Sequence, residues 1–288
     1  MPENLPDPQL LGNTIPAISG HHQYYLELHA AGEGIINDSI AHDTERLIAK
    51  SHSFISDLEI WLEVLAGRPE LPVLQAAVRE YQFSILALLQ GQYRYSFMAL
   101  RLFFELSLAS IRFSAHEIEY WLWERGQQDI KWATLVERDI SIANTNGNHK
   151  NAKAVIEADS EKITGNAVLS LDFVRAFSNQ AFAEAAPSYR TIASKVYREC
   201  SEFVHGNSQT HSQIPGALGF SQQVLTDWLD RADSIKLVVL FALCGRHLKF
   251  LDASALAKVE PIIRESLGHV DAVRNYLDSC TSELNKDN

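Results

Sequence analysis

Two residues near the end of one predicted helix carry side chains that can do chemistry together. Arg198 and His205 lie seven positions apart in the segment 188–205, so a helix places them on one face, two turns apart. Tyr197 and Ser201 lie near the same face. An imidazole transfers protons near neutral pH, and a guanidinium binds anions through several planar donors. The pair is therefore the first candidate for a functional site.

The same pair carries a resemblance to a known superfamily. Arg198-x6-His205 resembles the Arg-x(4–6)-His motif of HEPN proteins, the higher-eukaryote and prokaryote nucleotide-binding helical domains. The segments YSFMALRLFFELSL and VYRECSEFVHG also look like a matched helix pair of uncharacterised bacterial helical proteins of this general kind. The resemblance covers these two helices and the predicted helix Trp121–Gly126, a minority of the chain. Many HEPN nucleases have Asn, Asp or His directly after the arginine, where this chain has Glu199.

The resemblance implies metal-independent RNA cleavage by transesterification, without a cofactor. His205 would act as general acid or base on the attacking 2′-hydroxyl or the leaving oxygen, and Arg198 would bind the scissile phosphate. HEPN-like sites are usually built from two chains, so a homodimer is implied. The implied setting is a bacterial toxin or antiphage defence effector that acts on RNA, with a possible protein partner from a defence or toxin–antitoxin system.

The residues themselves leave a second interpretation open. Arg198 and His205 can instead pair with Glu105, Glu202 or main-chain carbonyls and hold two helices together. The chain would then be a catalytically inactive helical scaffold or regulatory subunit. Such a protein would bind its partner through the N-terminal arm or through the polar segment 141–165.

Further charged residues interrupt the apolar stretch Phe83–Phe113, which we predict to be a buried helix. Arg94, Arg101, Glu105 and Arg112 fall within about 20° of one line on such a helix. Arg101 and Glu105 are four apart and able to pair, which would fix the helix register. Alternatively, Glu105 orients His205 and Arg101 adds a phosphate contact. The supporting site residues are Arg101, Glu105, Tyr197, Glu199, Ser201 and Glu202.

Other patterns of catalytic or metal-binding type are weak. Glu202-x-x-His205 has the ligand spacing of di-iron helix bundles, but the second copy that such a site requires is missing. His42-Asp43 belongs to a polar helix face more readily than to a phosphohydrolase site. The three cysteines are far apart, without the spacing of a zinc site or a disulfide framework. We therefore predict neither a metal nor a cofactor.

Composition sets limits on partners and location. The 288 residues are 46% hydrophobic, enough for a substantial core, and carry a net charge of −11. That charge argues against nucleic-acid binding over the entire protein surface, and it leaves room for a local basic groove. No signal peptide or membrane span is recognisable, and we expect a cytoplasmic protein without membrane contact.

Helical periodicity without any useful strand pattern predicts an all-α, multi-helix bundle with a HEPN-like core. We expect an irregular, proline-rich arm at 1–20 and a single α-helical domain at 21–286. The polar, Asn-rich segment 141–165 is expected to be a long loop or insertion. The predicted helices cover 38–65, 71–113 with a bend at Gly91, 114–126 with Ser114 as N-cap, 132–140, 168–185, 189–205, 224–251, and 252 onwards with a new helix starting at Pro261.

Overall fold

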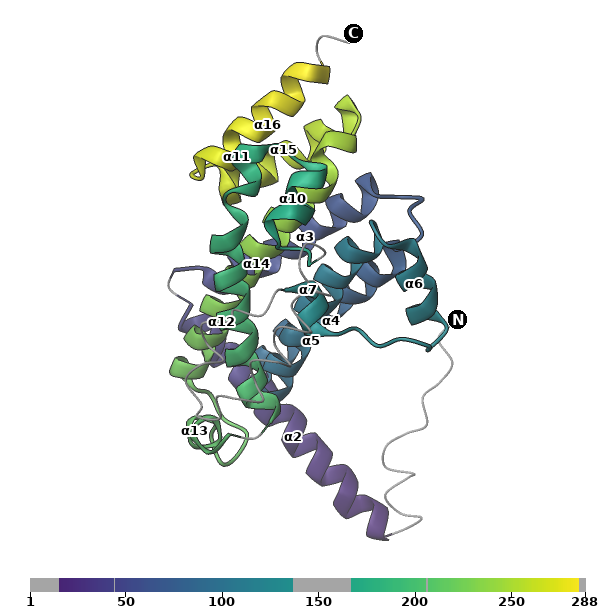
Figure 1. Cartoon of the computed structure of the whole chain (residues 1–288). Coiled ribbons are helices and arrows are strands. Elements are labelled where there is room, and N and C mark those ends of the chain that lie inside the picture. Colours follow the sequence, from purple (N-terminus) through teal and green to yellow (C-terminus); the bar gives the residue numbers. More distant parts are fainter. Residues whose placement is uncertain (1–15, 44, 137–166, 206, 285–288) are drawn as a thin grey trace, which may run out of the picture.

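The computed structural model describes residues 16–43, 45–136, 167–205 and 207–284. Within these ranges the secondary structure is helical and no strand occurs, so the prediction of an all-α bundle is confirmed (Figure 1). The insertion predicted at 141–165, the end of the helix predicted at 132–140 and the arm up to residue 15 lie outside the described residues.

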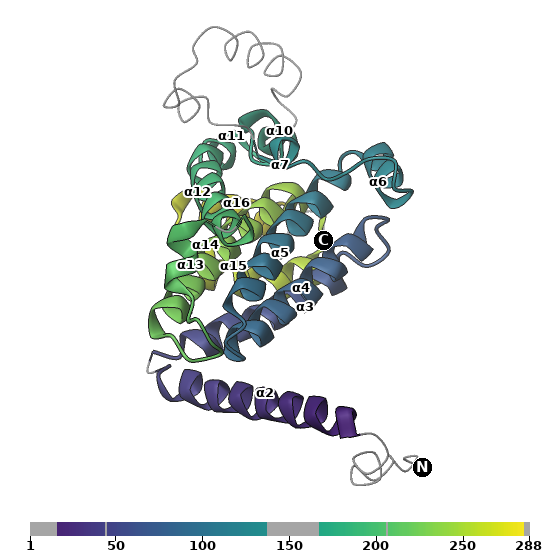
Figure 2. The same cartoon turned by 90° about the horizontal axis from the view of Figure 1, so that it is seen from below.

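Helix α5 (Tyr93–Phe113) lies at the centre of the bundle, between α4 (Leu71–Leu89), α12 (Ala186–Val204) and α14 (Gln222–His247) (Figure 2). Phe97, Leu100, Phe103 and Phe104 of α5 are fully buried. Helix α14 buries every residue from Val238 to His247, which matches its nearly continuous apolar sequence. The core therefore surrounds the helix that carries the charged stripe.

The stretch that we predicted to be one long helix is an antiparallel pair. Gly91 adopts a φ of +73°, and the amide of Gln92 donates to the Ala87 carbonyl (2.8 Å), so α4 ends and the chain reverses. The Ser84 hydroxyl then donates to the carbonyl of Ser96 across the pair (2.7 Å). Gly91 thus separates two helices instead of bending one.

The helix predicted at 38–65 is also two helices. Helix α2 (Pro16–Ala41) ends before Asp43, whose carboxylate accepts the amides of Leu47 (2.6 Å) and Ile48 (3.0 Å) at the start of α3 (Leu47–Val64). Arg46 between them has a φ of 55°, which no continuous α-helix allows. At its other end α2 begins at Pro16, inside the segment expected to be irregular, because proline suits the first helical turn.

Three further predicted boundaries are wrong for local reasons. Ser114 is the C-cap of α5 and donates to the Ile111 carbonyl, and His116 is the residue before α6 (Glu117–Glu124). The predicted helix at 168–185 is interrupted where Asn179 caps a new turn. Pro261 lies inside α15 instead of starting a helix. The remaining elements are α7 (Trp132–Leu135), α10 (Leu171–Phe177), α11 (Gln180–Ala183), α13 (Ser208–Gln213), the 3-10 helix η1 (Leu248–Phe250), α15 (Ala253–Leu267) and α16 (Asp271–Leu284).

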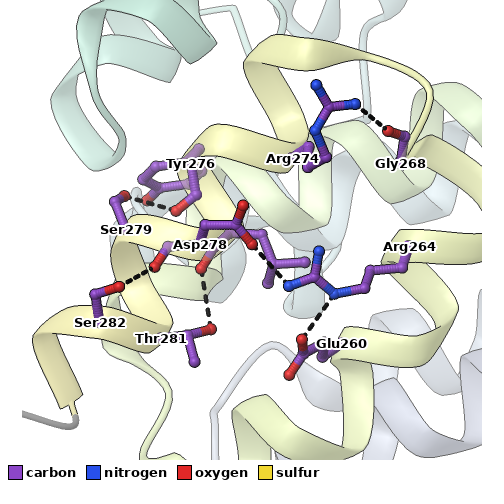
Figure 3. Close-up of polar contacts among 10 residues, drawn as sticks. Glu260, Arg264, Gly268, Arg274, Tyr276, Asp278, Ser279, Thr281 and Ser282 are labelled. Atoms are coloured by element: carbon purple, nitrogen blue, oxygen red, sulfur yellow. Dashed lines mark hydrogen bonds and ion pairs between the residues drawn. The ribbon is translucent and has the colours of Figure 1, made fainter.

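The last two helices form a hairpin at one end of the bundle. Figure 3 shows Arg264 of α15 donating to Glu260 on its own helix and to Asp278 on α16, both at 2.7 Å. Arg274 donates to the carbonyl of Gly268 in the connection (3.1 Å). These contacts lie at the surface, so the hairpin depends mainly on its buried apolar residues.

Candidate functional site

Helix α12 presents the two central site residues because its opposite face is fixed in the core. The Phe203 ring stacks on Phe97 of α5 with centroids 3.7 Å apart and planes at 7°. The buried face of α12 consists of Ala186, Tyr189, Ala193, Val196, Cys200 and Phe203. This face follows the three- and four-residue spacing of an amphipathic helix, which leaves the other face to solvent.

Arg198 and His205 both lie on the exposed face of α12. Seven residues of helix separate them by about 10 Å along the axis. Among the described residues, neither side chain makes a hydrogen bond or an ion pair, and His205 is the residue at which α12 ends. The expected pairing of these two side chains with Glu105 or Glu202 is therefore not present in the described part of the chain.

Arg101, Glu105 and Tyr197 form a closed triad between α5 and α12. The Arg101 Nη2 donates to the Tyr197 hydroxyl (2.6 Å) and to the Glu105 Oε1 (3.1 Å), and the hydroxyl donates to the same Oε1 (2.7 Å). The guanidinium also lies over the Tyr197 ring, 4.7 Å from its centroid. Glu105 is thus bonded to Tyr197 and Arg101. This arrangement fits the interpretation in which the Arg101–Glu105 pair fixes the register of α5.

The triad is covered by Trp132 of α7. Its ring stacks on Tyr197 with centroids 3.7 Å apart and planes at 5°. Burial, together with the carboxylate of Glu105, raises the pKa of Tyr197 to about 12, so its hydroxyl remains a proton donor at neutral pH. Trp132 was not predicted to belong to the site, because no local spacing connects it to Tyr197, 65 positions later in the sequence.

The other supporting residues have separate contacts. Glu199 pairs with Arg231 of α14 (3.3 Å) and more weakly with Lys195 (4.0 Å), so it connects α12 to α14. The Ser201 hydroxyl donates to the Tyr197 carbonyl one turn back (2.7 Å). The Glu202 carboxylate is partly exposed on the same side as His205 and makes no hydrogen bond or ion pair with a described residue. Of these three supporting residues, Glu202 is therefore the one that adds an available polar group beside Arg198 and His205.

The register of α5 and α12 brings a second arginine toward the His205 end of α12. The contacts of Phe97 with Phe203 and of Arg101 with Tyr197 show that the two helices run antiparallel. Arg94, one turn before Phe97, must then lie toward His205. It lines a groove of about 920 Å³ that α2, the α4–α5 turn and residues 214–218 enclose.

The thiols of Cys200 and Cys244 are buried in the core. Burial raises the pKa of the Cys200 thiol to about 12, and it raises the pKa of the Cys244 thiol as well, so both stay protonated. In the described ranges, no three His, Cys, Asp or Glu residues are grouped in a way that suits a metal ion.

Across the described ranges, none of the helices combines the length and the apolar character that a bilayer crossing requires. Comparison with protein-family models, curated proteins and solved structures gave no match.

Proposed function

We propose that the chain is a metal-independent, HEPN-like endoribonuclease in which Arg198 and His205 act on the scissile phosphodiester. The observation that supports this most is the exposure of both side chains on one face of α12, with no hydrogen bond or ion pair to a described residue. A helix that is fixed on its opposite face holds the two groups in place and leaves them available to a substrate.

In the proposed reaction the 2′-oxygen attacks the neighbouring phosphorus, and the bond from phosphorus to the 5′-oxygen breaks. His205 removes the proton of the 2′-hydroxyl or delivers one to the departing 5′-oxygen. Arg198 binds the non-bridging oxygens and stabilises the negative charge that develops on them. The products are a 2′,3′-cyclic phosphate end and a 5′-hydroxyl end.

A homodimer belongs to this proposal. One chain offers a single histidine at the site, and a second copy facing it would supply the other proton-transfer group. The proposed role as a cytoplasmic toxin or antiphage defence effector rests on the resemblance alone. The net charge of −11 disfavours RNA binding over the whole surface, so we expect binding to depend on Arg198 and on other local cations.

The test is cleavage of labelled single-stranded RNA by the purified chain in the presence of EDTA. We expect products with 2′,3′-cyclic phosphate ends, and we expect His205→Ala and Arg198→Ala to lower the rate by about 100-fold or more. His52→Ala and Arg125→Ala are matched controls, because they remove an exposed histidine and an exposed arginine away from the site. Cleavage that persists in His205→Ala would overturn the proposal.

A second candidate function is a catalytically inactive scaffold or regulatory subunit. The exposed Tyr24, Tyr25 and Leu26 on α2 favour it, since exposed apolar groups of this size mark protein contacts. Induced expression separates the two functions. A nuclease predicts toxicity that His205→Ala relieves at an unchanged level of folded protein, whereas a scaffold predicts that His205→Ala changes nothing.

A further inference from the structure

Helices α3, α14 and α15 pack on one another (Figure 1), and a cavity of about 380 Å³ lies between them. Its wall comes from the first turns of α3, the middle of α14 and the end of α15. Tyr81 of α4 also lines it, and the tyrosine hydroxyl donates to the Ser51 carbonyl (3.1 Å). Pockets for small organic ligands usually measure about 300–1,000 Å³. None of the lining residues belongs to the α12 site, so the cavity is a separate candidate site.

Part of the cavity wall is apolar. Leu229 of α14 and Tyr81 are buried, while Leu47 of α3 and Leu237 of α14 are half-buried. A hydrocarbon group that enters the cavity loses its contact with water against these side chains, and this burial favours binding. The apolar wall therefore suits a ligand that carries an apolar side chain.

Charged side chains of both signs line the same cavity. Helix α14 contributes Asp230, Asp233 and Lys236, α15 contributes Glu265, and α3 contributes Lys50. Asp233 and Lys236 are three positions apart, a spacing at which opposite charges on a helix can pair. Within the described part of the chain, however, none of these side chains forms an ion pair or a hydrogen bond. Their charges are therefore available to a ligand.

Lys236 is the least exposed of the charged groups in the cavity wall. Its ammonium lies 5.7 Å from the centroid of the Phe54 ring, at the outer limit of a cation–π contact. Asp57 of α3 is a nearby carboxylate, but burial raises its pKa more than Lys236 lowers it, and no ion pair joins the two. A half-buried ammonium in these surroundings gains a charge-assisted hydrogen bond when a ligand brings a carboxylate to it.

We propose that this cavity binds a zwitterionic small molecule of the amino-acid class with an apolar side chain. The ligand carboxylate pairs with Lys236, and the ligand ammonium pairs with Asp233 and Glu265. The side chain lies against the apolar part of the wall. A metal ion or an inorganic anion matches the cavity less well, because lining charges of its own sign repel it. The proposal does not depend on RNA cleavage.

The test is calorimetric titration of the full-length chain with L-phenylalanine and with two analogues that each lack one charge. L-Phenylalaninamide keeps the ammonium group, and hydrocinnamate keeps the carboxylate. The titrations are done at about pH 6, below the pKa of the amino group. We expect L-phenylalanine to bind with a dissociation constant in the millimolar range or below, and each analogue to bind at least about tenfold more weakly.

Variants assign each ligand charge to its partner. Lys236→Met should weaken L-phenylalanine at least about tenfold and leave L-phenylalaninamide unchanged, because the amide has no carboxylate for Lys236. The double variant Asp233→Asn, Glu265→Gln should weaken L-phenylalanine equally and leave hydrocinnamate no weaker. Both carboxylates are exposed, so this variant tests the site even where Lys236→Met lowers stability.

The matched controls neutralise exposed charges that do not line the cavity. They are Lys131→Met and the double variant Glu124→Gln, Asp129→Asn, and neither should change binding. Absence of L-phenylalanine binding at about 10 mM would overturn the proposal. So would binding of both analogues as tightly as L-phenylalanine, or binding of L-phenylalanine that the cavity variants and the controls leave equally unchanged.

Discussion

Arg101 on α5 and Tyr197 on α12 are joined in two ways, by a hydrogen bond of 2.6 Å and by the guanidinium lying over the tyrosine ring. Tyr197→Phe removes the hydroxyl and keeps the ring that stacks on Trp132. We expect it to lower the free energy of unfolding by about 1–2 kcal/mol, since Arg101 and Glu105 lose a hydrogen-bonding partner. Urea unfolding followed by circular dichroism measures this loss.

The matched control for that variant is Tyr95→Phe. Tyr95 is exposed on the same helix as Arg101, and its hydroxyl makes no hydrogen bond with a described residue, so stability should stay within about 0.5 kcal/mol. If the two variants behave alike, the Tyr197 hydroxyl does not hold α12 on α5.

The short-range features of the site were readable from the sequence. Arg101 and Glu105 pair as their four-residue spacing predicts, and Arg198 and His205 share one face of α12 as their seven-residue spacing predicts, whereas the exposure of that face was not predicted. The pairing and the shared face depend only on helix geometry. The all-α fold followed in the same way from periodicity that no strand pattern interrupts.

The contacts between distant segments were not readable. The helical spacing of apolar residues continues on both sides of Gly91, so the sequence predicted one bent helix. The structure shows two helices that meet at Gly91, where φ is positive. The stack of Trp132 on Tyr197 and the ion pair of Glu199 with Arg231 join segments that lie at least 32 positions apart in the sequence. Local spacing carries no information on such contacts, because the packing of the whole bundle decides them.

Gly91→Ala tests the turn on which α2 rests. A Cβ at this position would lie 2.8 Å from the Ile35 Cδ1, and the backbone φ of +73° disfavours any residue with a Cβ. We expect a loss of about 1–3 kcal/mol in the free energy of unfolding, together with faster proteolysis of α2 as Ile35 is displaced. Limited proteolysis and urea unfolding measure the two effects.

Gly34→Ala is the matched control for the glycine variant. Gly34 lies one residue before Ile35 inside α2, and a Cβ there would have no neighbour within 4 Å. Because alanine favours helix over glycine, this variant should gain about 0.5–1 kcal/mol. If both variants lower the free energy of unfolding, the loss in Gly91→Ala cannot be assigned to the backbone geometry of the turn.

Two buried arginines should respond differently to replacement. The Arg246 guanidinium lies over the rings of Phe177 and Phe250 and donates to the Ser114 carbonyl (2.7 Å), and burial lowers its pKa to about 10. No ion pair of Arg246 occurs within the described residues. Arg246→Met should therefore cost less than about 1 kcal/mol or increase stability, because a buried charge is exchanged for an apolar side chain of similar length.

Arg112→Met provides the contrast. Arg112 donates to both carboxylate oxygens of Glu119, at 2.6 and 2.7 Å, and to the Thr134 carbonyl at 3.0 Å. Its removal leaves a partly buried carboxylate without its partner, so we expect a loss of about 2–4 kcal/mol. Equal losses from Arg246→Met and Arg112→Met in urea unfolding would contradict this account.

The buried His247 should make the protein less stable in acid. Burial, with Arg246 and Arg68 nearby, holds the pKa of its imidazole well below the usual value of 6.5. The folded state therefore resists protonation that the unfolded state accepts. Stability is complete above about pH 6.5 and falls as the pH drops below it, by up to about 1.4 kcal/mol per pH unit for one proton.

His247→Leu removes the titrating group from the core, and His52→Leu removes an exposed histidine as its control. The free energy of unfolding should be measured in urea between pH 5 and pH 8. We expect the decline below pH 6.5 to be smaller in His247→Leu than in the unaltered chain and unchanged in His52→Leu. Some decline should persist, because burial also lowers the pKa of His116. Identical pH profiles for all three proteins would show that His247 accepts a proton in the folded state without cost.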